Sequence, residues 1–340
     1  MCGIAGYLNK IKNFDESQNI SLLQKFCSLL RHRGPDSKGI WYDINDKIFL
    51  SHTRLSINDL TQNGSQPMVN DLKNHIVIFN GEIYNHLYIR EKYLKNYKID
   101  WKSNSDTETL LKTIEFYGVK KSLEMFEGMF SFCLFNKCSK KVYLARDKFG
   151  EKPMFYGVIN DNFVFGSELK ALKAHPVFQN TINRDSLCLL LRHNTISSPY
   201  SIYEGIFKLA PGSILSLNLD NKEAEVETYW SMKEVVQSAL NNPFEGSEQQ
   251  ALLELESILS KSVSDQMVSD VPLGAFLSGG IDSSTIVALM QAQSTNKIKT
   301  FSIGFNEKEF DEYLISEIII KPVEKDKLES RIEEIKNMIK

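Results

Sequence analysis

The sequence predicts an α+β fold for residues 1–215, with layered antiparallel sheets flanked by helices, followed by the start of a parallel α/β unit. Short apolar runs separated by Gly, Asn and Asp turns indicate strands in the first part. Helical segments are mixed with these strands without strict alternation, which favours α+β. After about residue 245 the order becomes strand, turn, helix, strand, which is typical of a parallel sheet.

The elements expected in the first part follow from these apolar runs and from helical spacing. The strands are expected at Gly3–Leu8, Ile48–Ser51, His75–Phe79, Met129–Asn136, Lys141–Arg146 and Asn162–Ser167. The helices are expected at Ile20–Arg31, Thr107–Tyr117 and Ser186–Arg192. No internal repeat is visible.

The polar stretch "NNPFEGSEQQ" marks the boundary between the two parts, since Pro243 and Gly246 interrupt regular structure there. We therefore expect a first domain at 1–215, a linker at 216–245, a second domain at 246–312 and a tail at 313–340.

A long amphipathic helix is expected just after the boundary. Its apolar residues recur at near-helical spacing, at Leu252, Leu255, Ile258, Leu259, Val263 and Met267. "VPLGAFLS" then reads as a strand, Gly279-Gly280 as a tight turn, "SSTIVALMQAQ" as a helix and "KTFSIGF" as a second strand. This order predicts one βαβ unit.

Composition excludes several classes of protein. The 340 residues are 42% apolar and 24% charged, and a net charge of −3 argues against a basic nucleic-acid binder. No run approaches the ~20 apolar residues of a membrane span, and the start lacks the features of a signal peptide. The five cysteines form no CxxC pair, so neither a zinc site nor a disulfide framework is indicated. A reducing, cytoplasmic location is expected.

Cys2 is the first candidate catalytic residue. If Met1 is removed, Cys2 carries both a thiol and a free α-amine, so one residue supplies nucleophile and base. An α-amine titrates near ~8, which suits it to move a proton to and from sulfur at working pH. The alternative is a small residue that follows the initiator by coincidence.

Three further stretches complement Cys2. Arg54 in "SHTRLSI" can grip a carboxylate, and Asn80 beside Gly81 in "FNGEIYN", directly after a strand, suits an oxyanion hole. Glu82 and Asp106 supply two acids for an ammonium group. Singly, Arg54 and Glu82 read as surface charges and Asp106 as a helix N-cap. Together they describe a clamp for an amino acid whose carboxamide reaches the thiol, which is glutamine.

The motifs "CGIAGY", "RHRGPDSKG", "HTRLSI", "FNGEIYN", "SDTE" and "RDKFGEKPMFY" resemble those of class II glutamine amidotransferases. The resemblance implies an N-terminal-nucleophile hydrolase fold over 1–215, with Cys2 as the nucleophile and Asn80 and Gly81 as the oxyanion hole. It also implies a loop that closes over glutamine, with Arg31, His32 and Asp36 supporting closure. The implied glutamine-binding residues are Arg54, Leu55, Ser56, Ile57, Asn80, Gly81, Glu82 and Asp106.

"SGGIDSS" at 278–284 follows a strand and opens a helix, so its N–H groups can hold phosphate. It lacks the lysine of a Walker A motif. It resembles the pyrophosphate-binding loop of enzymes that adenylate a carboxylate, which implies ATP and Mg²⁺, with Asp282 helping to hold the metal. The implied ATP-binding residues are Leu277, Ser278, Gly279, Gly280, Asp282, Ser283, Ser284 and Ile303.

An amidotransferase domain followed by this loop resembles the glutamine-hydrolysing asparagine synthetases. The resemblance implies that glutamine, aspartate and ATP are the small-molecule partners, and that ammonia converts an aspartyl adenylate to asparagine. An acceptor such as a sugar carboxylate of surface polysaccharide is an alternative within the adenylating class. Amination of a sugar phosphate or a phosphoribosyl donor is a second alternative, which "SGGIDSS" disfavours. A regulatory or interaction remnant without activity is a third.

The resemblance ends near Glu312 by motif. The following tail predicts a helix capped by Asp326 and Glu329, with an apolar face of Leu328, Ile332, Ile335 and Ile339. We expect this face to pack on the chain itself, with a homodimer contact as the alternative. In the second domain, two parallel strands and one helix leave apolar surface uncovered, so we expect weak ATP binding and adenylation that is absent or very slow. The first domain is still expected to work as a glutaminase.

Overall fold

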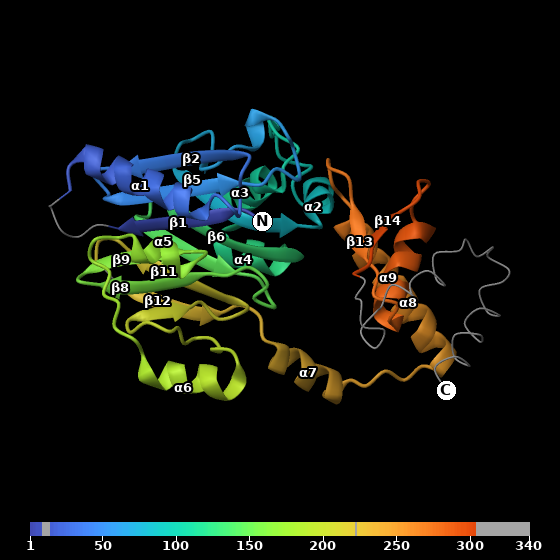
Figure 1. The fold of residues 1–340 in the computed structure, drawn as a ribbon. Coiled ribbons are helices and arrows are strands. Elements are labelled where there is room, and N and C mark those ends of the chain that lie inside the picture. Colours follow the sequence, from blue (N-terminus) through green and yellow to red (C-terminus); the bar gives the residue numbers. More distant parts are fainter. Residues whose placement is uncertain (9–13, 222, 304–340) are drawn as a thin grey trace. The chain divides into compact units, whose positions relative to one another are not determined.

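A computed structural model describes residues 1–8, 14–221 and 223–303 of the chain (Figure 1). The chain forms two compact units, Met1–Phe244 and Glu245–Lys340. No helix within the described ranges is both long and apolar enough to cross a membrane. The expected tail helix after residue 313 lies outside the described residues.

Two six-stranded antiparallel sheets form the centre of the first unit. The first sheet has the order β10-β8-β9-β1-β3-β2, with β1 (Gly3–Leu8), β2 (Ser37–Asp43), β3 (Ile48–Arg54), β8 (Phe155–Ile159), β9 (Asn162–Gly166) and β10 (Ile206–Lys208). The second has the order β12-β11-β7-β6-β5-β4, with β4 (Met68–Val69), β5 (His75–Ile83), β6 (Gly128–Asn136), β7 (Lys141–Arg146), β11 (Ser213–Asn218) and β12 (Ala224–Thr228).

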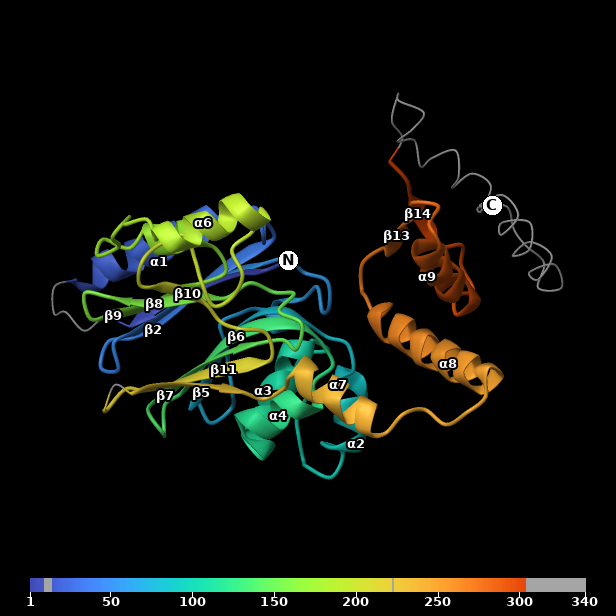
Figure 2. The ribbon, with the colours of Figure 1, turned by 90° about the horizontal axis from the view of Figure 1, so that it is seen from below.

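Helices cover the outer faces of both sheets, as the two ribbon views show (Figures 1 and 2). The apolar side chains of α1 (Glu16–Leu30) and α5 (Leu169–Lys173) share a core cluster with the first sheet. Those of α2 (His86–Lys92), α3 (Asp106–Tyr117) and α4 (Val119–Met125) share one with the second. The remaining helices of the unit are η1 (Gln62–Gly64), α6 (Arg184–His193) and α7 (Met232–Asn241). The predicted α+β sandwich is confirmed.

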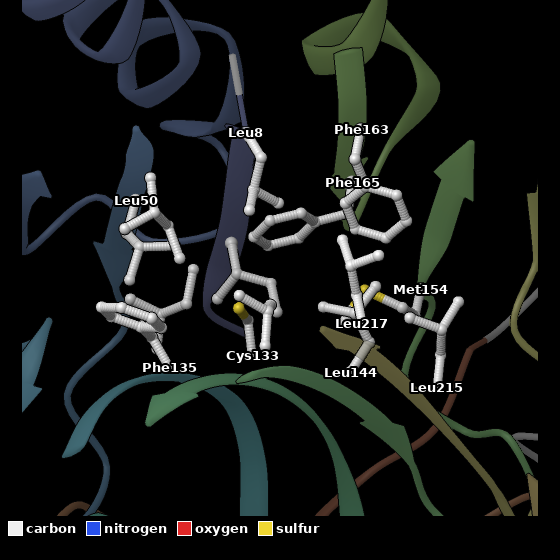
Figure 3. Packing of buried hydrophobic residues seen from close by; sticks show 14 of the residues in the cluster. Leu8, Leu50, Cys133, Phe135, Leu144, Met154, Phe163, Phe165, Leu215 and Leu217 are labelled. Atoms are coloured by element: carbon white, nitrogen blue, oxygen red, sulfur yellow. The ribbon is translucent and has the colours of Figure 1, made fainter. Parts of the chain in front are cut away.

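The two sheets pack against each other through alternate residues of each strand (Figure 3). On β1 these are Ile4 and Leu8, whereas Tyr7, which faces the opposite way, packs against the α1 side. On β5, Ile76 and Ile78 enter the same inner core. This is the two-residue period expected of strands with both faces covered. Residues that continue the period at one end of the strands therefore lie between the sheets.

Several elements differ from the sequence prediction. Asn80 and Gly81 lie within β5 rather than after it, because the strand continues to Ile83 through its pairing with β6. Asp106 is the first residue of α3, and the cap is Ser105, whose side chain accepts from the N–H of Glu108. The sequence analysis also missed β2, β4, β8, β10, β11, β12, α2, α4, α5 and α7. Of these, β12 and α7 lie in the stretch expected to be a linker.

The second unit contains the expected βαβ arrangement. Helix α8 (Glu248–Gln266) begins at a capping box formed by Ser247 and Gln250. After it, β13 (Gly274–Phe276) pairs in parallel with β14 (Lys299–Phe301), and α9 (Ile281–Ala292) connects the two strands. The predicted parallel pair is confirmed.

Asp147 is a buried carboxylate that organises the loop after β7. It is fully buried, and its two oxygens accept four backbone N–H groups, those of Phe130 (3.2 Å), Phe149 (3.0 Å), Glu151 (2.9 Å) and Lys152 (3.0 Å). Hydrogen bonds to a charged group contribute more than neutral ones, and each lost partner would remain buried.

Asp147→Ala should therefore lower the free energy of unfolding by about 3 kcal/mol or more. Urea unfolding followed by circular dichroism measures this change. Asp220→Ala, at an exposed turn, is the matched control and should change the free energy of unfolding by less than ~0.5 kcal/mol. Equal stability of the two variants would contradict the assigned role of Asp147.

Candidate active site

A pocket lies at one end of the first unit, where β1, β3 and β5 carry polar residues instead of core residues. It encloses about 590 Å³ of space, part of it open to solvent. Its lining residues are Met1, Cys2, Arg54, Leu55, Ile57, Asn58, Gly64, Gln66, Phe79, Asn80, Gly81, Glu82, Ser105, Asp106, Thr107, Met129 and Lys152. The structure thus brings Cys2, Arg54, Asn80, Gly81, Glu82 and Asp106 together from four separate segments.

The Cys2 thiol lines this pocket and is held there by Leu55. The Leu55 N–H donates to Sγ at 3.4 Å, and Sγ lies 3.7 Å from the Leu55 carbonyl oxygen. Burial raises the pKa of the Cys2 thiol, while the Leu55 N–H acts in the opposite direction. The resting group is therefore a neutral thiol at neutral pH, and attack on a carbonyl requires a base to take its proton.

A candidate base is the chain's own amine, whose charge interacts with Cys2. Burial lowers the pKa of the Met1 α-amine, and the positive charges of Arg33 and Lys152 lower it further. In the presence of Met1, the Cys2 nitrogen is an amide and cannot accept a proton. Removal of Met1 would place the free amine on Cys2 itself, one bond from the carbon that carries the thiol side chain.

Asn80 has the properties of an unused hydrogen-bond donor. Its side chain is fully buried, and neither its Nδ2 nor its Oδ1 has a partner among the described residues. A buried amide without a partner costs about 1–3 kcal/mol, so such groups are retained mainly where a ligand completes them. Gly81 follows with φ of +154°, and a Cβ there would lie 2.1 Å from the Met129 carbonyl oxygen. Only glycine fits this position.

Two carboxyl groups, those of Glu82 and Asp106, line the same pocket. Asp106 is 5% exposed, and burial raises its pKa to about 7, with the charge of Glu82 adding to the rise. The N–H of Ile83 donates to Asp106 Oδ2 at 2.9 Å. Burial also raises the pKa of Glu82, and the positive charge of Lys152 opposes that rise. Both acids are therefore suited to gain a cationic partner.

Arg54 ends β3 and is 6% exposed, so it is not a surface charge. Its Nη1 donates to the Thr61 carbonyl at 2.9 Å, and its Nη2 donates to the carbonyls of Asn58 and Asp59. These bonds fix the guanidinium rigidly. They also use three of its five N–H groups, so at most two remain for a substrate carboxylate.

The other expected residues are placed less directly. Leu55 and Ile57 line the pocket, whereas Ser56 does not, and its N–H donates to Asp36 Oδ2 at 2.8 Å. In "RHRGPD", the side chain that reaches Cys2 is Arg33, which the sequence analysis did not single out. Its Nε donates to the Cys2 carbonyl at 3.0 Å.

His32 lies away from the Cys2 thiol and does not line the pocket. Its Nε2 lies 2.8 Å from Glu168 Oε1, the same oxygen that Arg33 Nη1 contacts at 3.0 Å. Arg31 is exposed. The segment is thus joined to Cys2 through Arg33, and Glu168 holds both Arg33 and His32.

Besides Met1, six polar or sulfur-containing residues of the pocket were not predicted from the sequence: Asn58, Gln66, Ser105, Thr107, Met129 and Lys152. Lys152 is 5% exposed, burial lowers its pKa, and its Nζ lies 2.8 Å from Met129 Sδ. Its position within "RDKFGEKPMFY" was the available signal, but a single lysine carries no pattern that indicates burial.

In the second unit, the loop between β13 and α9 has the form expected of a phosphate-binding turn. Gly279 has φ of +78°. Helix α9 begins at Ile281, and the residue before it, Gly280, has no side chain that could cap the helix. Ser278 and Ser283 contact each other through their hydroxyl groups at 3.1 Å. The first N–H groups of α9 are therefore free of side-chain caps, as an anion site requires.

The two residues expected beside adenosine differ in exposure: Leu277 is buried, and Ile303 is 61% exposed. Asp282 lies in the first turn of α9. Within the described ranges, no group of three or more His, Cys, Asp or Glu side chains is placed to hold a metal. The loop fits a phosphate group by its N–H donors, and Asp282 is the acid nearest to it in sequence.

Comparison with protein families agrees with this arrangement. Residues 1–230 match the glutamine amidotransferase domain, and residues 254–335 match asparagine synthase. The first match covers both sheets and the whole pocket. The chain therefore belongs to the glutamine amidotransferases, and within them to the family in which an asparagine synthase domain follows. The predicted family is confirmed. The asparagine synthase match continues to residue 335, although the sequence motifs that resemble asparagine synthetases end near Glu312.

Two curated relatives carry names from the same family. The chain is 35% identical to a putative glutamine-hydrolysing asparagine synthetase 2 of Methanocaldococcus jannaschii, with 94% of this chain and 62% of that protein covered. It is also 35% identical to glutamine-hydrolysing asparagine synthetase 1 of Bacillus subtilis, covering 92% and 47%. The chain thus spans about half to three fifths of these relatives' lengths. A glutamine phosphoribosylpyrophosphate amidotransferase structure from B. subtilis is 19% identical with a TM-score of 0.49, covering 95% and 69%.

Proposed function

We propose that the first unit hydrolyses glutamine to glutamate and ammonia, with Cys2 as the nucleophile after removal of Met1. The observation that carries this proposal is one pocket that holds the Cys2 thiol, the unpartnered Asn80 amide, two acids and the fixed Arg54. In this proposal Arg54 binds the α-carboxylate of glutamine, and Glu82 and Asp106 bind its α-ammonium. The carboxamide then lies between Sγ and Asn80.

The chemistry follows from these positions. Sγ attacks the carboxamide carbon while the Cys2 α-amine takes the thiol proton, and the oxyanion is stabilised by the Asn80 amide and the Gly81 N–H. The amine returns its proton to the leaving nitrogen, so ammonia departs and a thioester remains. Water, deprotonated by the same amine, then releases glutamate and restores the thiol.

We further propose that the ammonia is used to amidate a carboxylate activated by ATP, with aspartate as the acceptor. The asparagine synthase match and the uncapped turn before α9 support this assignment. Mg-ATP would supply the adenylate that makes the carboxylate an electrophile. In the chain itself, the N–H groups of Gly279–Ser284 would hold the phosphates, and Asp282 would face the metal.

One assay tests both parts. Purified protein is given glutamine, aspartate and Mg-ATP, and glutamate and pyrophosphate are measured together, with Cys2→Ala as the control. Glutamate formed only by the parent protein supports the glutaminase assignment, and its absence would refute it. Pyrophosphate that requires aspartate supports the synthetase assignment, whereas glutamate without pyrophosphate would confine this chain to glutamine hydrolysis.

The raised pKa of Asp106 predicts a pH dependence of binding. Below the pKa of about 7, the carboxyl group is protonated and neutral, so it must lose a proton before it can pair with an ammonium group. Calorimetry with Cys2→Ala, which cannot hydrolyse the ligand, should show glutamine affinity falling up to about tenfold per pH unit below 7. Above pH 7 the affinity should level off. The variant that also carries Asp106→Asn should bind weakly without this dependence, and a flat profile with Asp106 present would contradict the assignment.

A further inference from the structure

A ring of hydrogen bonds joins β5 to the start of α3 around the pocket. The N–H of Phe79 donates to Gln66 Oε1 at 2.6 Å, and Gln66 Nε2 donates to Thr107 Oγ1 at 3.2 Å. Thr107 Oγ1 donates to Asp106 Oδ1 at 3.5 Å, and the Ile83 N–H donates to Asp106 Oδ2 at 2.9 Å. The ring therefore leaves β5 at Phe79 and returns to it at Ile83.

The ring replaces a missing strand at the edge of β5. Strand β4 pairs with β5 only at Ile76 and Val77, so the β5 peptide groups beyond that point have no strand partner on this side among the residues that the structure describes. Side chains instead satisfy both polar backbone groups of Phe79. Its N–H donates to Gln66, and its carbonyl accepts from His52 Nε2 at 3.1 Å. Buried backbone groups require such partners. The backbone is thereby held immediately before Asn80.

We propose that Gln66 and Thr107 are positioning residues that fix the distance between the oxyanion site on β5 and the Asp106 carboxylate. This inference rests on the proposed glutamine hydrolysis. The two ends of one glutamine molecule must meet Asn80 and Asp106 simultaneously, so the spacing of those groups controls both binding and reaction. Gln66 and Thr107 are 8% and 3% exposed. Rotation of the Gln66 amide would break bonds to both sides of the pocket.

Three variants separate the contribution of the Gln66 side chain from that of the Thr107 hydroxyl. Gln66→Met keeps the length of the side chain and removes both of its hydrogen bonds. Thr107→Val keeps the shape of threonine and removes only the link to Gln66 and Asp106, and Thr107→Ser restores the hydroxyl. Gln237→Met, at an exposed position on α7, is the matched control.

Steady-state glutamine hydrolysis should distinguish positioning from a general loss of folded protein. Gln66→Met should lower kcat by roughly 10- to 100-fold, because the oxyanion donor loses its support. Thr107→Val should raise KM by about tenfold with kcat within about threefold, and Thr107→Ser should recover most of that loss. Loss of folded protein would lower apparent kcat alone and leave KM unchanged, so the change in KM of Thr107→Val excludes it, and the kcat of Gln66→Met is expressed per folded molecule, measured by circular dichroism on the same sample.

Amide hydrogen exchange gives a readout that needs no substrate. Residues 79–83 should exchange faster in Gln66→Met and Thr107→Val than in the parent protein, while Gln237→Met should match the parent. Unchanged exchange, or unchanged kcat and KM in folded Gln66→Met and Thr107→Val, would overturn the positioning role. If the parent releases no glutamate through Cys2, the proposed function fails, and the exchange measurement still decides whether the ring holds this segment. If Gln66→Met does not fold, the two Thr107 variants decide.

Discussion

Replacing Cys2 with alanine should abolish glutamate release, with a loss of about 10³-fold or more in kcat. Among the residues that line the pocket, Cys2 carries the one thiol, and alanine removes it while leaving the backbone contacts of residue 2 available. Burial raises the pKa of the thiol, so its attack depends on a base that takes the proton, and alanine leaves that base without a nucleophile to activate. A coupled glutamate dehydrogenase assay measures the change.

The control for this variant is the same substitution at a cysteine outside the pocket. Cys138 and Cys188 are exposed, and Cys138→Ala and Cys188→Ala should each retain activity within about twofold. If Cys2→Ala also retained activity, the nucleophile would lie elsewhere. If Cys138→Ala or Cys188→Ala also lost activity, the loss in Cys2→Ala would not be specific to Cys2 and would not identify it as the nucleophile.

Asn80→Ala should separate activity from stability. Loss of an oxyanion donor should lower kcat by about 10²- to 10³-fold, with a much smaller effect on KM because the donor acts mainly on the transition state. The folded protein should not be destabilised by loss of the amide's hydrogen bonds, since neither amide atom has a partner among the described residues. Thermal unfolding and steady-state kinetics on the same sample measure both quantities.

Asn85→Ala is the matched control, and it should lose stability and keep activity. The Asn85 side chain donates to the Met125 carbonyl at 2.9 Å and accepts from the Glu127 N–H at 3.0 Å, so its loss should cost about 1–3 kcal/mol of stability. Activity per folded molecule should remain. If Asn80→Ala destabilised the protein as much as Asn85→Ala while kcat stayed unchanged, Asn80 would be a structural residue.

The sequence was sufficient where a structure depends on local pattern. The strands β1 and β7 match their expected bounds because apolar runs between turns define them, and β13 and β14 were expected from the same signal. Edge and near-edge strands were missed. For example, β12 is short and polar, and it forms because β11 offers it a partner. Asp106 was read as a cap because the adjacent Ser105 gives the same local signal.

The candidate site shows the same division. Cys2, Arg54 and Asn80 belong to compact motifs, so their residue types pointed to one chemistry before their positions were known. Gln66 and Thr107 acquire their contacts across 13 to 41 residues of sequence. No local pattern reports contacts of that range, because they arise only when β5 and α3 pack together.

The most direct test of the proposed function is to identify the atom that carries the glutamyl group during turnover. The protein is mixed with glutamine, quenched in acid and examined by mass spectrometry, both intact and after proteolysis. We predict a chain that has lost Met1 and carries a glutamyl thioester on the peptide that begins at Cys2, absent from Cys2→Ala. A glutamyl group on any other residue, or full activity in protein that retains Met1, would contradict the account.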